Sequence, residues 1–276
     1  MPELPEVEAT RQQLARWTEE SRVAAVELVD AAVGGGSAFD GPGGLVGYRF
    51  VRWERRGKAL AGVTDGPVLS AHLGMTGRWV ADDERRFARL VIHLEKKRGR
   101  PAAIAYLDAR RLGHARLVAS VDEVFAGLGP DAWRTPLGPA ALKAALGRGA
   151  ATLKERLLDQ KRVAGLGNIA VIEACFRARV HPHTPIAQVG DAVFRRLVPA
   201  IHAHLEATLA STLAEERVTY VSEGGDNIFQ IYGRKGEPCP RCETLVVREV
   251  LAGRPTFYCP RCQRLPVVPA ARKEEP

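Results

Sequence analysis

Four of the five cysteines constrain the fold more than any other feature of this sequence. They form two CxxC pairs near the C-terminus, Cys239 with Cys242 and Cys259 with Cys262, and sixteen residues separate the pairs. Each pair can place two sulfur atoms on one side of a tight turn, and two such turns complete a tetrahedral shell of four thiolates. The spacing therefore predicts one structural Zn²⁺, with an iron centre or a redox pair as the alternatives.

The segment between the two cysteine pairs is expected to form a hairpin. Its sequence is TLVVREVLAGRPTFYC, and Arg254 falls at the expected turn. A hairpin braced by zinc is a rigid way to present one arginine to a DNA groove or to phosphates. The alternative is that Arg254 is a solvated turn residue without a ligand.

The composition limits the classes of protein to which the chain can belong. Its 276 residues, 46% of them hydrophobic, can build one large or two modest domains with real cores. The formal net charge of +8 favours a polyanionic partner, and an ordinary basic surface is the alternative. The start is acidic and no long apolar run follows it, so we expect a cytoplasmic protein with neither a signal peptide nor a membrane partner.

The pattern of the chain changes near its middle. Between residues 22 and 119, short β-branched or alternating segments are separated by glycine-rich and charged turns, which predicts a sandwich or barrel. The segment LGPDAWRTPLGPA then holds three prolines and two glycines, as expected of a linker. Helical patterns follow, and Pro199 is expected to kink the longest helix or to divide it in two. The predicted α+β parts are an N-terminal β-sandwich domain at residues 1–130, a helical domain at 131–227, a four-cysteine module at 228–265 and a disordered tail at 266–276.

The first residues, MPELPEVE, predict a helix that begins near residue 5. Pro5 suits a first helical position, and the acidic side chains of Glu6 and Glu8 complement the positive end of the helix dipole. This interpretation leaves Pro2 and Glu3 unexplained.

A glycine-rich motif, KRVAGLGNIAVIEA, joins two predicted helices. Gly165 and Gly167 allow positive φ, and Asn168 is a suitable N-cap for the helix that follows. The exposed N–H groups of such a helix start suit a phosphate, but an ordinary helical hairpin is the alternative. Three shorter motifs, RRGK, HLGMTG and DARRLG, each fit an ordinary turn, core or surface role when taken singly.

Taken together, these segments resemble one family, the bacterial formamidopyrimidine-DNA glycosylases with their endonuclease VIII relatives. The matching segments, in chain order, are PELPEVE, RRGK, HLGMTG, DARRLG, LLDQKRVAGLGN, YGRKGEPCPRC and RPTFYCPRC. PELPEVE and HLGMTG favour the formamidopyrimidine branch. The resemblance implies a β-sandwich followed by a helical domain with a helix–two-turn–helix motif and a zinc-ribbon hairpin. It also implies a monomer, associated with the nucleoid, that acts on damaged double-stranded DNA.

The resemblance implies a bifunctional enzyme, a DNA glycosylase and abasic-site lyase. Its substrates would be 8-oxoguanine, formamidopyrimidines and, more broadly, oxidised pyrimidines. Pro2 would become the N-terminal residue after removal of Met1, and an α-amino group, with a pKa near 8, is far less protonated at neutral pH than a lysine. That amine could attack C1′ and form an iminium ion, which allows β- and then δ-elimination. The resemblance makes Glu3 the proton shuttle, with Glu6 as support, and makes Lys58 a cation that stabilises developing charge.

A base inside a duplex cannot reach Pro2, so the nucleotide must be flipped out of the helix. By resemblance, Met75, Arg110 and Leu112 would fill the gap, and Arg110 would hydrogen-bond the estranged base. The phosphate or lesion contacts implied by the resemblance are Lys154, Asn168 and, from the zinc finger, Arg254.

Several positions depart from the family pattern. The usual wedge phenylalanine is Leu112, and the usual tyrosine after GNI is Ala170. A histidine common in the β-domain is absent, and Arg85 or Arg86 is the candidate replacement. The segment at 218–234, where the family has a loop that caps 8-oxoguanine, is several residues shorter than usual. These departures leave the preferred lesion and opposite base open.

Two other classes of function stay open. A catalytically silent protein that binds DNA lesions would explain the changed recognition positions, but it has no need of Pro2, Glu3 and Lys58. A zinc-ribbon transcription or RNA-binding factor would explain the charge and the cysteine pairs, but not the N-terminus.

Overall fold

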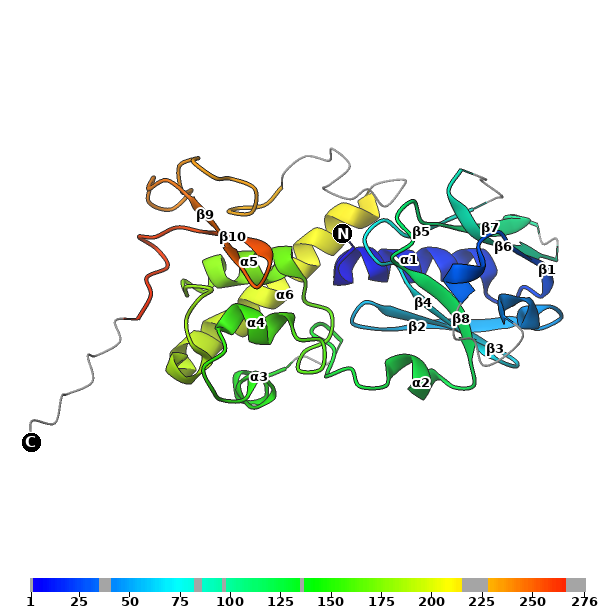
Figure 1. Cartoon of the computed structure of the whole chain (residues 1–276), viewed down its shortest axis with the longest axis horizontal. Coiled ribbons are helices and arrows are strands. Elements are labelled where there is room, and N and C mark those ends of the chain that lie inside the picture. Colours follow the sequence, from blue (N-terminus) through cyan, green and yellow to red (C-terminus); the bar gives the residue numbers. More distant parts are fainter. Residues whose placement is uncertain are drawn as a thin grey trace, which may run out of the picture.

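The structure is a computed structural model. It describes residues 2–34, 41–81, 86–95, 98–134, 137–214 and 228–266. The molecule is elongated, with a strand-rich half at one end and a helical half at the other (Figure 1). Within the described ranges, no helix has both the length and the apolar character needed to span a lipid bilayer.

Helix α1 (Leu4–Thr18) begins the chain, as the sequence predicts. Its first turn is fixed by a capping box, in which the Glu3 N–H donates to the Glu6 carboxylate at 3.0 Å. The apolar side chains of Val7 and Leu14 point into the core of the strand-rich half. The N-terminal peptide is therefore held at one defined place.

Two antiparallel sheets of four strands each form the strand-rich half. The first sheet has the order β1-β6-β7-β5, and its strands are β1 (Val23–Leu28), β6 (Ala88–Leu94), β7 (Ala103–Leu107) and β5 (Arg78–Ala81). The second has the order β2-β3-β4-β8, with β2 (Phe50–Arg56), β3 (Ala59–Thr64), β4 (Val68–His72) and β8 (His114–Val118). Side chains of both sheets meet in one core, which includes Trp53 and Leu69 from the second sheet and Trp79 and Tyr106 from the first. This arrangement confirms the predicted sandwich.

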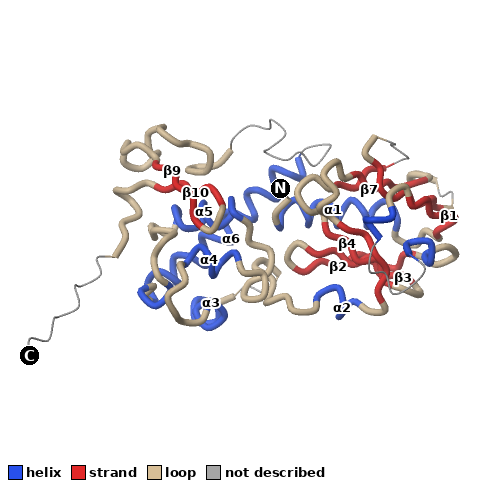
Figure 2. Tube along the Cα trace, viewed as in Figure 1, coloured by secondary structure: helices blue, strands red, loops and turns tan. Residues whose placement is uncertain are grey.

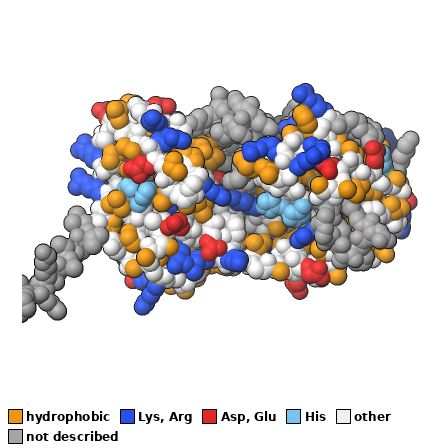
Figure 3. All heavy atoms as spheres, viewed as in Figure 1, with side chains coloured by type: hydrophobic (Ala, Val, Ile, Leu, Met, Phe, Trp, Pro, Cys, Tyr) orange, Lys and Arg blue, Asp and Glu red, His pale blue; other side chains and the backbone are white. Residues whose placement is uncertain are grey.

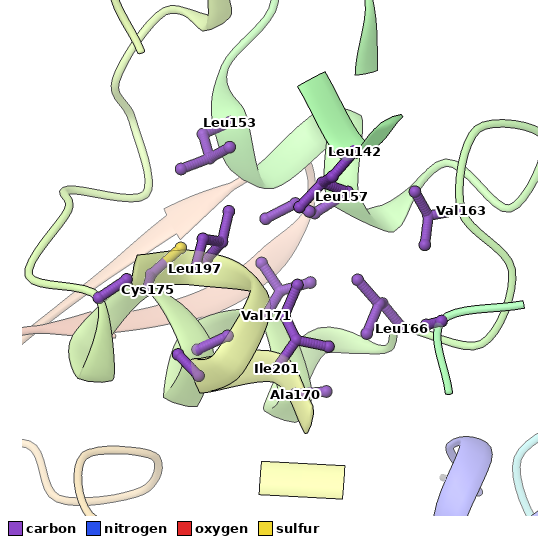
Figure 4. Packing of buried hydrophobic residues seen from close by; sticks show 14 of the residues in the cluster. Leu142, Leu153, Leu157, Val163, Leu166, Ala170, Val171, Cys175, Leu197 and Ile201 are labelled. Atoms are coloured by element: carbon purple, nitrogen blue, oxygen red, sulfur yellow. The ribbon is translucent and has the colours of Figure 1, made fainter. Parts of the chain in front are cut away.

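The helical half packs around an aliphatic core. Its helices are α3 (Pro139–Leu146), α4 (Leu153–Leu158), α5 (Asn168–Arg177) and α6 (Asp191–Ala214), with a short 3₁₀ turn at Ile186–Gln188. Side chains such as Leu157, Val171 and Leu197 interdigitate there, and Cys175 is buried among them as expected (Figure 4). The short helix α2 (Val121–Phe125) instead packs on β3 and β8 of the strand-rich half, which also contains 3₁₀ turns at Ala31–Gly34 and Gly41–Leu45.

Pro199 lies inside α6 without dividing it, so the predicted alternative of two separate helices is wrong. Proline removes one backbone donor from a helix. Leu197 and Ile201 on either side of Pro199 are buried in the core, and we infer that this packing holds the helix continuous. Tertiary burial here outweighs a local helix breaker.

A two-stranded hairpin, β9 (Val247–Leu251) and β10 (Arg254–Tyr258), lies beside α5 in the helical half (Figure 2). Ala252 and Gly253 form its turn, and both have positive φ, which suits a two-residue hairpin connection. Arg254 follows directly as the first residue of β10. The hairpin predicted between the cysteine pairs is confirmed.

Candidate active site and metal centre

The N-terminal peptide of the strand-rich half binds directly to a helix of the other half. Pro2 and Glu3 are both buried, and Glu3 is only 4% exposed. The Glu3 carboxylate accepts hydrogen bonds from the N–H groups of Ile169 at 2.9 Å and Ala170 at 3.0 Å, in the first turn of α5. A helix N-terminus favours a negative charge, so the contact is electrostatically suited to Glu3.

Gly167 makes room for this contact. It is the N-cap of α5, with an extended φ of −113°, and a Cβ atom there would lie 2.1 Å from the carboxyl carbon of Glu3. The prediction that Asn168 is the N-cap is wrong, because Asn168 is the first residue of the helix itself. Gly167 is thus required for close approach rather than for a left-handed backbone, whereas Gly165 does have a positive φ of 111°.

Glu6 and Lys58 lie in the same electrostatic environment as Glu3. Burial raises the pKa of Glu6, and the neighbouring charge of Glu3 raises it further. Lys58 occupies the turn between β2 and β3. Burial lowers the pKa of Lys58, and the positive charge of Arg254 adds to that effect, whereas Glu3 and Glu6 oppose it. Groups predicted from three separate motifs therefore act on one another across the interface of the two halves.

Lys154 and Asn168 hold the hairpin that carries Arg254. The Lys154 side chain is fully buried, and its ammonium donates to the Thr256 hydroxyl at 2.6 Å and to the Pro255 carbonyl at 3.3 Å. The Asn168 amide donates to the same Pro255 carbonyl at 3.0 Å. Burial, together with the charge of Arg254, lowers the pKa of Lys154 to about 8. A direct DNA contact by Lys154 would require its ammonium to leave these acceptors.

The four paired cysteines form a candidate metal centre. Their sulfur atoms all lie within 4.8 Å of one another, and the Sγ–Sγ distances include 3.4 Å for Cys242 and Cys262 and 4.0 Å for Cys239 and Cys262. Zinc–sulfur bonds of about 2.3 Å in a tetrahedron require separations near 3.8 Å. The cysteines are free thiols rather than disulfides. The donor set and spacing fit one structural Zn²⁺, as predicted.

Buried polar side chains attach the zinc-binding module to α5, and sequence reasoning missed them. Glu173 accepts hydrogen bonds from the backbone N–H groups of residues 230–232 at 2.9 to 3.1 Å. Gln263 is fully buried, and its amide donates to the Val180 carbonyl at 2.9 Å. The signal for Glu173 was present in the sequence, since an acidic residue interrupts the apolar helix segment NIAVIEACF.

A second group of candidate residues lies on two adjoining loops of the strand-rich half. Met75 is 38% exposed and Leu112 is 49% exposed, and Arg110 is exposed as well. The two loops touch, because a Cβ atom at Gly74 would lie 2.5 Å from the backbone carbonyl carbon of Leu112. The structure thus brings the three predicted gap-filling residues onto one surface.

Asp108 fixes the shape of this surface. It is fully buried and accepts from the N–H groups of Leu112 at 2.9 Å and Arg110 at 3.2 Å, and from the Thr76 hydroxyl at 2.6 Å. One carboxylate therefore orders both loops, a role that sequence reasoning did not assign to it. Arg85 and residues 218–227, where two further predictions fall, lie outside the described residues.

Basic side chains gather where the two halves meet. The space-filling view shows Lys, Arg and His side chains across the middle of this face, in the hollow between the strand-rich and helical halves (Figure 3). The exposed Arg254 and the partly buried Lys58 interact electrostatically with each other, and Lys58 also interacts with the buried Glu3. The basic side chains of this face suit a polyanion. The exposed apolar side chains nearby suit insertion into a stack of bases.

Comparisons with known proteins cover almost the whole chain. Three family models match: the formamidopyrimidine-DNA glycosylase N-terminal domain at residues 1–115, the formamidopyrimidine-DNA glycosylase H2TH domain at 128–218, and the zinc finger found in FPG and IleRS at 236–265. The formamidopyrimidine-DNA glycosylase of Novosphingobium aromaticivorans is 40% identical over 96% of this chain and all of its own length. That of Phenylobacterium zucineum is 38% identical with the same coverage.

Solved structures of the same kind are also similar. MutM in complex with DNA that contains carbocyclic 8-oxo-G superposes with a TM-score of 0.82 at 27% identity, over 95% of this chain and all of that chain. The Lactococcus lactis Fpg bound to DNA with an abasic site gives a TM-score of 0.83 at 26% identity, with the same coverage.

Proposed function

Because the chain belongs to the formamidopyrimidine-DNA glycosylase family, we propose that it excises oxidised bases from damaged double-stranded DNA and then cleaves the strand through a Schiff base on Pro2. The observation that carries this proposal is the convergence around Glu3. The N-terminal peptide, the Lys58 turn and the Arg254 hairpin come from three distant parts of the chain and interact electrostatically at one place. A protein that only bound lesions would not need this combination.

The proposed chemistry begins with the amine of Pro2, which is free once Met1 has been removed. Its nitrogen attacks C1′ of the flipped nucleotide, and the base leaves with the electron pair of the glycosidic bond and gains a proton from water. The nitrogen then gives its own proton to the Glu3 carboxylate, and Glu3 passes that proton to O4′ as the C1′–O4′ bond breaks, which leaves an iminium ion between Pro2 and C1′. Since the iminium nitrogen bears a fixed positive charge, the 2′ proton becomes acidic.

Strand cleavage follows from that acidity. Loss of the 2′ proton expels the 3′ phosphate by β-elimination, and a second proton loss expels the 5′ phosphate by δ-elimination. Glu3 would carry these protons, with Glu6 as its support, while Lys58 and Arg254 would bind the phosphates and stabilise the charge that develops on them. The exposed position of Arg254 and the partly buried position of Lys58 are compatible with these roles.

The DNA would be opened by the surface that Met75, Arg110 and Leu112 form on two adjoining loops. Met75 and Leu112 would fill the space left by the flipped nucleotide, and Arg110 would hydrogen-bond the base that lost its partner. Their exposure and their common ordering by Asp108 support this assignment. Asn168 would add to the phosphate site, Lys154 would do so once its ammonium leaves its hairpin acceptors, and Arg85 is proposed as a further DNA contact.

The test is reductive trapping on defined duplexes. The purified protein is incubated with DNA that contains 8-oxoguanine, dihydrouracil or an abasic site, reduced with borohydride, and compared with Pro2→Gly. We expect a covalent adduct with the wild type, at least a hundredfold less with the variant, and peptide mapping of the adduct to the N-terminal residue. An intact-mass spectrum checks that Met1 is absent.

The duplex that gives most adduct also ranks the lesions. Absence of any adduct on the abasic duplex, with tight binding retained, would overturn the enzyme proposal and leave a silent lesion-binding protein. An adduct that maps to an internal lysine would instead reject Pro2 as the nucleophile.

A further inference from the structure

One buried arginine connects two parts of the chain that carry candidate active-site residues, the N-terminal helix and the Lys58 turn, to the linker before the helical half. The side chain of Arg55, near the end of β2, is fully buried. Its Nε donates to the Glu8 carboxylate of α1 at 2.9 Å, and one terminal nitrogen donates to the Asp131 carboxylate of the linker at 2.7 Å. The second terminal nitrogen reaches the other oxygen of Asp131 at 3.3 Å. Arg55 thus joins the N-terminal helix, the sandwich and the linker.

The Asp131 carboxylate also binds the turn that carries Lys58. It accepts the N–H of Gly57 at 2.7 Å, while the Arg55 guanidinium donates to the Gly57 carbonyl at 2.8 Å. Both backbone groups of the residue before Lys58 are therefore bound by one buried ion pair. An arginine–carboxylate pair with two parallel contacts is strong and geometrically specific.

The same linker residue is registered against the helical half. Asp131 forms a parallel β-bridge with Ala164, in which the Ala132 N–H donates to the Ala164 carbonyl at 3.0 Å. Gly57 packs on this segment so closely that a Cβ atom on it would lie 2.8 Å from the Gly165 nitrogen. Gly165 begins the short turn that leads to α5. The first turn of α5 binds the Glu3 carboxylate. The ion pair therefore fixes Lys58 and the α5 N-terminus relative to each other.

The ion pair is more than a general stabilising contact. A buried pair gains little net stability over apolar residues, because desolvation of both charges offsets their attraction. Its distinctive property is geometric, since it fixes the separation and angle of the elements that it joins. Here these elements are the ones that carry Glu3 and Lys58.

We propose that Asp131, through its ion pair with Arg55, is a positioning residue that holds Lys58 in register with the N-terminal amine and α5 for base excision and strand cleavage. The inference rests on the proposed function of the chain. It assigns no substrate contact to Asp131 or Arg55, because both are buried away from the DNA-facing surface.

The decisive experiment is a double-mutant cycle with Lys58. Single-turnover excision and strand cleavage are measured for the wild type, Asp131→Asn, Lys58→Gln and the double variant. If Asp131 acts through Lys58, then Asp131→Asn lowers the rate by tenfold or more in the wild-type background and by less than twofold in the Lys58→Gln background. Equal losses in the two backgrounds would overturn the proposal, since they would mean that Asp131 acts on general stability.

A second readout distinguishes positioning from stability independently of rate. If the Lys58 ammonium loses its place on a phosphate, the slope of log affinity against log salt concentration falls by about 0.9 for a duplex with an uncleavable abasic analogue. Asp131→Glu, which restores the charge, should recover part of both the rate and the slope. An unchanged slope in Asp131→Asn would contradict the proposal.

Two further variants serve as a matched control and as a substitute if the first variant does not fold. Asp191→Asn removes a carboxylate from the exposed ion pair with Lys143 in the same half, at 2.6 Å, and should leave rate and slope unchanged. If Asp131→Asn does not fold, Gly57→Ala serves instead, because its Cβ would push the Lys58 turn off the helical half while both charged side chains of the ion pair are retained. Gly57→Ala should show the same dependence on Lys58, and full activity of Gly57→Ala would overturn the proposal. Loss of wild-type trapping would instead reject the proposed function.

Discussion

The strand-rich half encloses a broad aromatic core, whereas the zinc-binding module packs its few apolar side chains mainly against helix α5. In the former, Trp79 lies between Trp53 and Tyr106, with ring centroids 6.4 and 5.2 Å away. In the latter, the core consists of α5 residues such as Phe176 together with Phe257 and two of the cysteines. Aromatic packing on that scale supports a fold by itself, and a module this small needs a metal.

The difference also shows how each part holds its functional groups. The strand-rich half carries Lys58, Met75 and Leu112 on short turns between strands of a rigid sandwich. The zinc-binding module carries Arg254 on a hairpin whose orientation depends on the buried polar residues Lys154 and Glu173. The comparison teaches that perturbations of the metal or of buried polar contacts should affect DNA binding long before they affect the sandwich.

Removal of zinc should give the largest effect. Cys239→Ser, or chelation of the wild type, should unfold the module and reduce DNA affinity by more than a hundredfold, because metal binding and folding of such a site are one event worth about 10 kcal/mol or more. Zinc content, duplex affinity and tryptophan fluorescence measure the outcome, since Trp53 and Trp79 report on the sandwich. Loss of metal with unchanged affinity would show that the module holds Arg254 without it.

Replacement of Glu173 by glutamine should give the next largest effect. The variant keeps the shape of the side chain but loses the charge that binds three backbone N–H groups, at a cost of about 2–3 kcal/mol in the free energy of unfolding. Urea titration measures this loss. Glu206→Gln, at an exposed position on α6, is the matched control and should change the stability by less than about 0.5 kcal/mol.

Acidification should lower the folding stability of the two halves to different extents, with a smaller effect than the changes above. Burial lowers the pKa of His181, His204 and His114 to about 4, against 6.5 for the free side chain. Between these values the unfolded chain takes up protons that the folded chain does not, so stability is complete above pH 6.5 and falls as the pH drops towards 4.

Two of these histidines belong to the helical half, where His181 packs on Tyr258 and His204 on Phe229. Burial also lowers the pKa of His72 in the strand-rich half, but among the described histidines there only that of His114 falls to about 4. We therefore expect the helical half to lose cooperative structure at a higher pH than the sandwich. Thermal melts at pH 7, 6, 5 and 4, followed by fluorescence and by far-ultraviolet circular dichroism, check the order. His204→Gln should remove part of the pH dependence, and an unchanged dependence would contradict the assignment.

Leu112→Phe should give the smallest effect on stability and a selective effect on recognition. Leu112 is half exposed, so a larger side chain meets no packed neighbour in the free protein and should shift the melting temperature by less than about 2 °C. An aromatic wedge would add stacking, so we expect excision rates to change severalfold with the identity of the opposite base. Leu213→Phe, at another exposed position, is the control for added bulk.

The sequence by itself determined the features that local spacing fixes. The two CxxC pairs predicted the zinc site and the hairpin between them, and the first eight residues predicted α1, because tight turns and helix starts depend on residues a few positions apart. The alternation of short strands predicted the sandwich for the same reason. The order of motifs along the chain then identified the family.

Only the tertiary structure decided how distant segments meet. Glu3 binds α5 across 167 residues of sequence, Gly167 provides space rather than positive φ, and Lys154 is buried under the hairpin. Pro199 is tolerated in α6 because its neighbours are buried on one side of an intact helix. None of these follows from a local pattern, because each depends on packing between segments that are distant in the sequence.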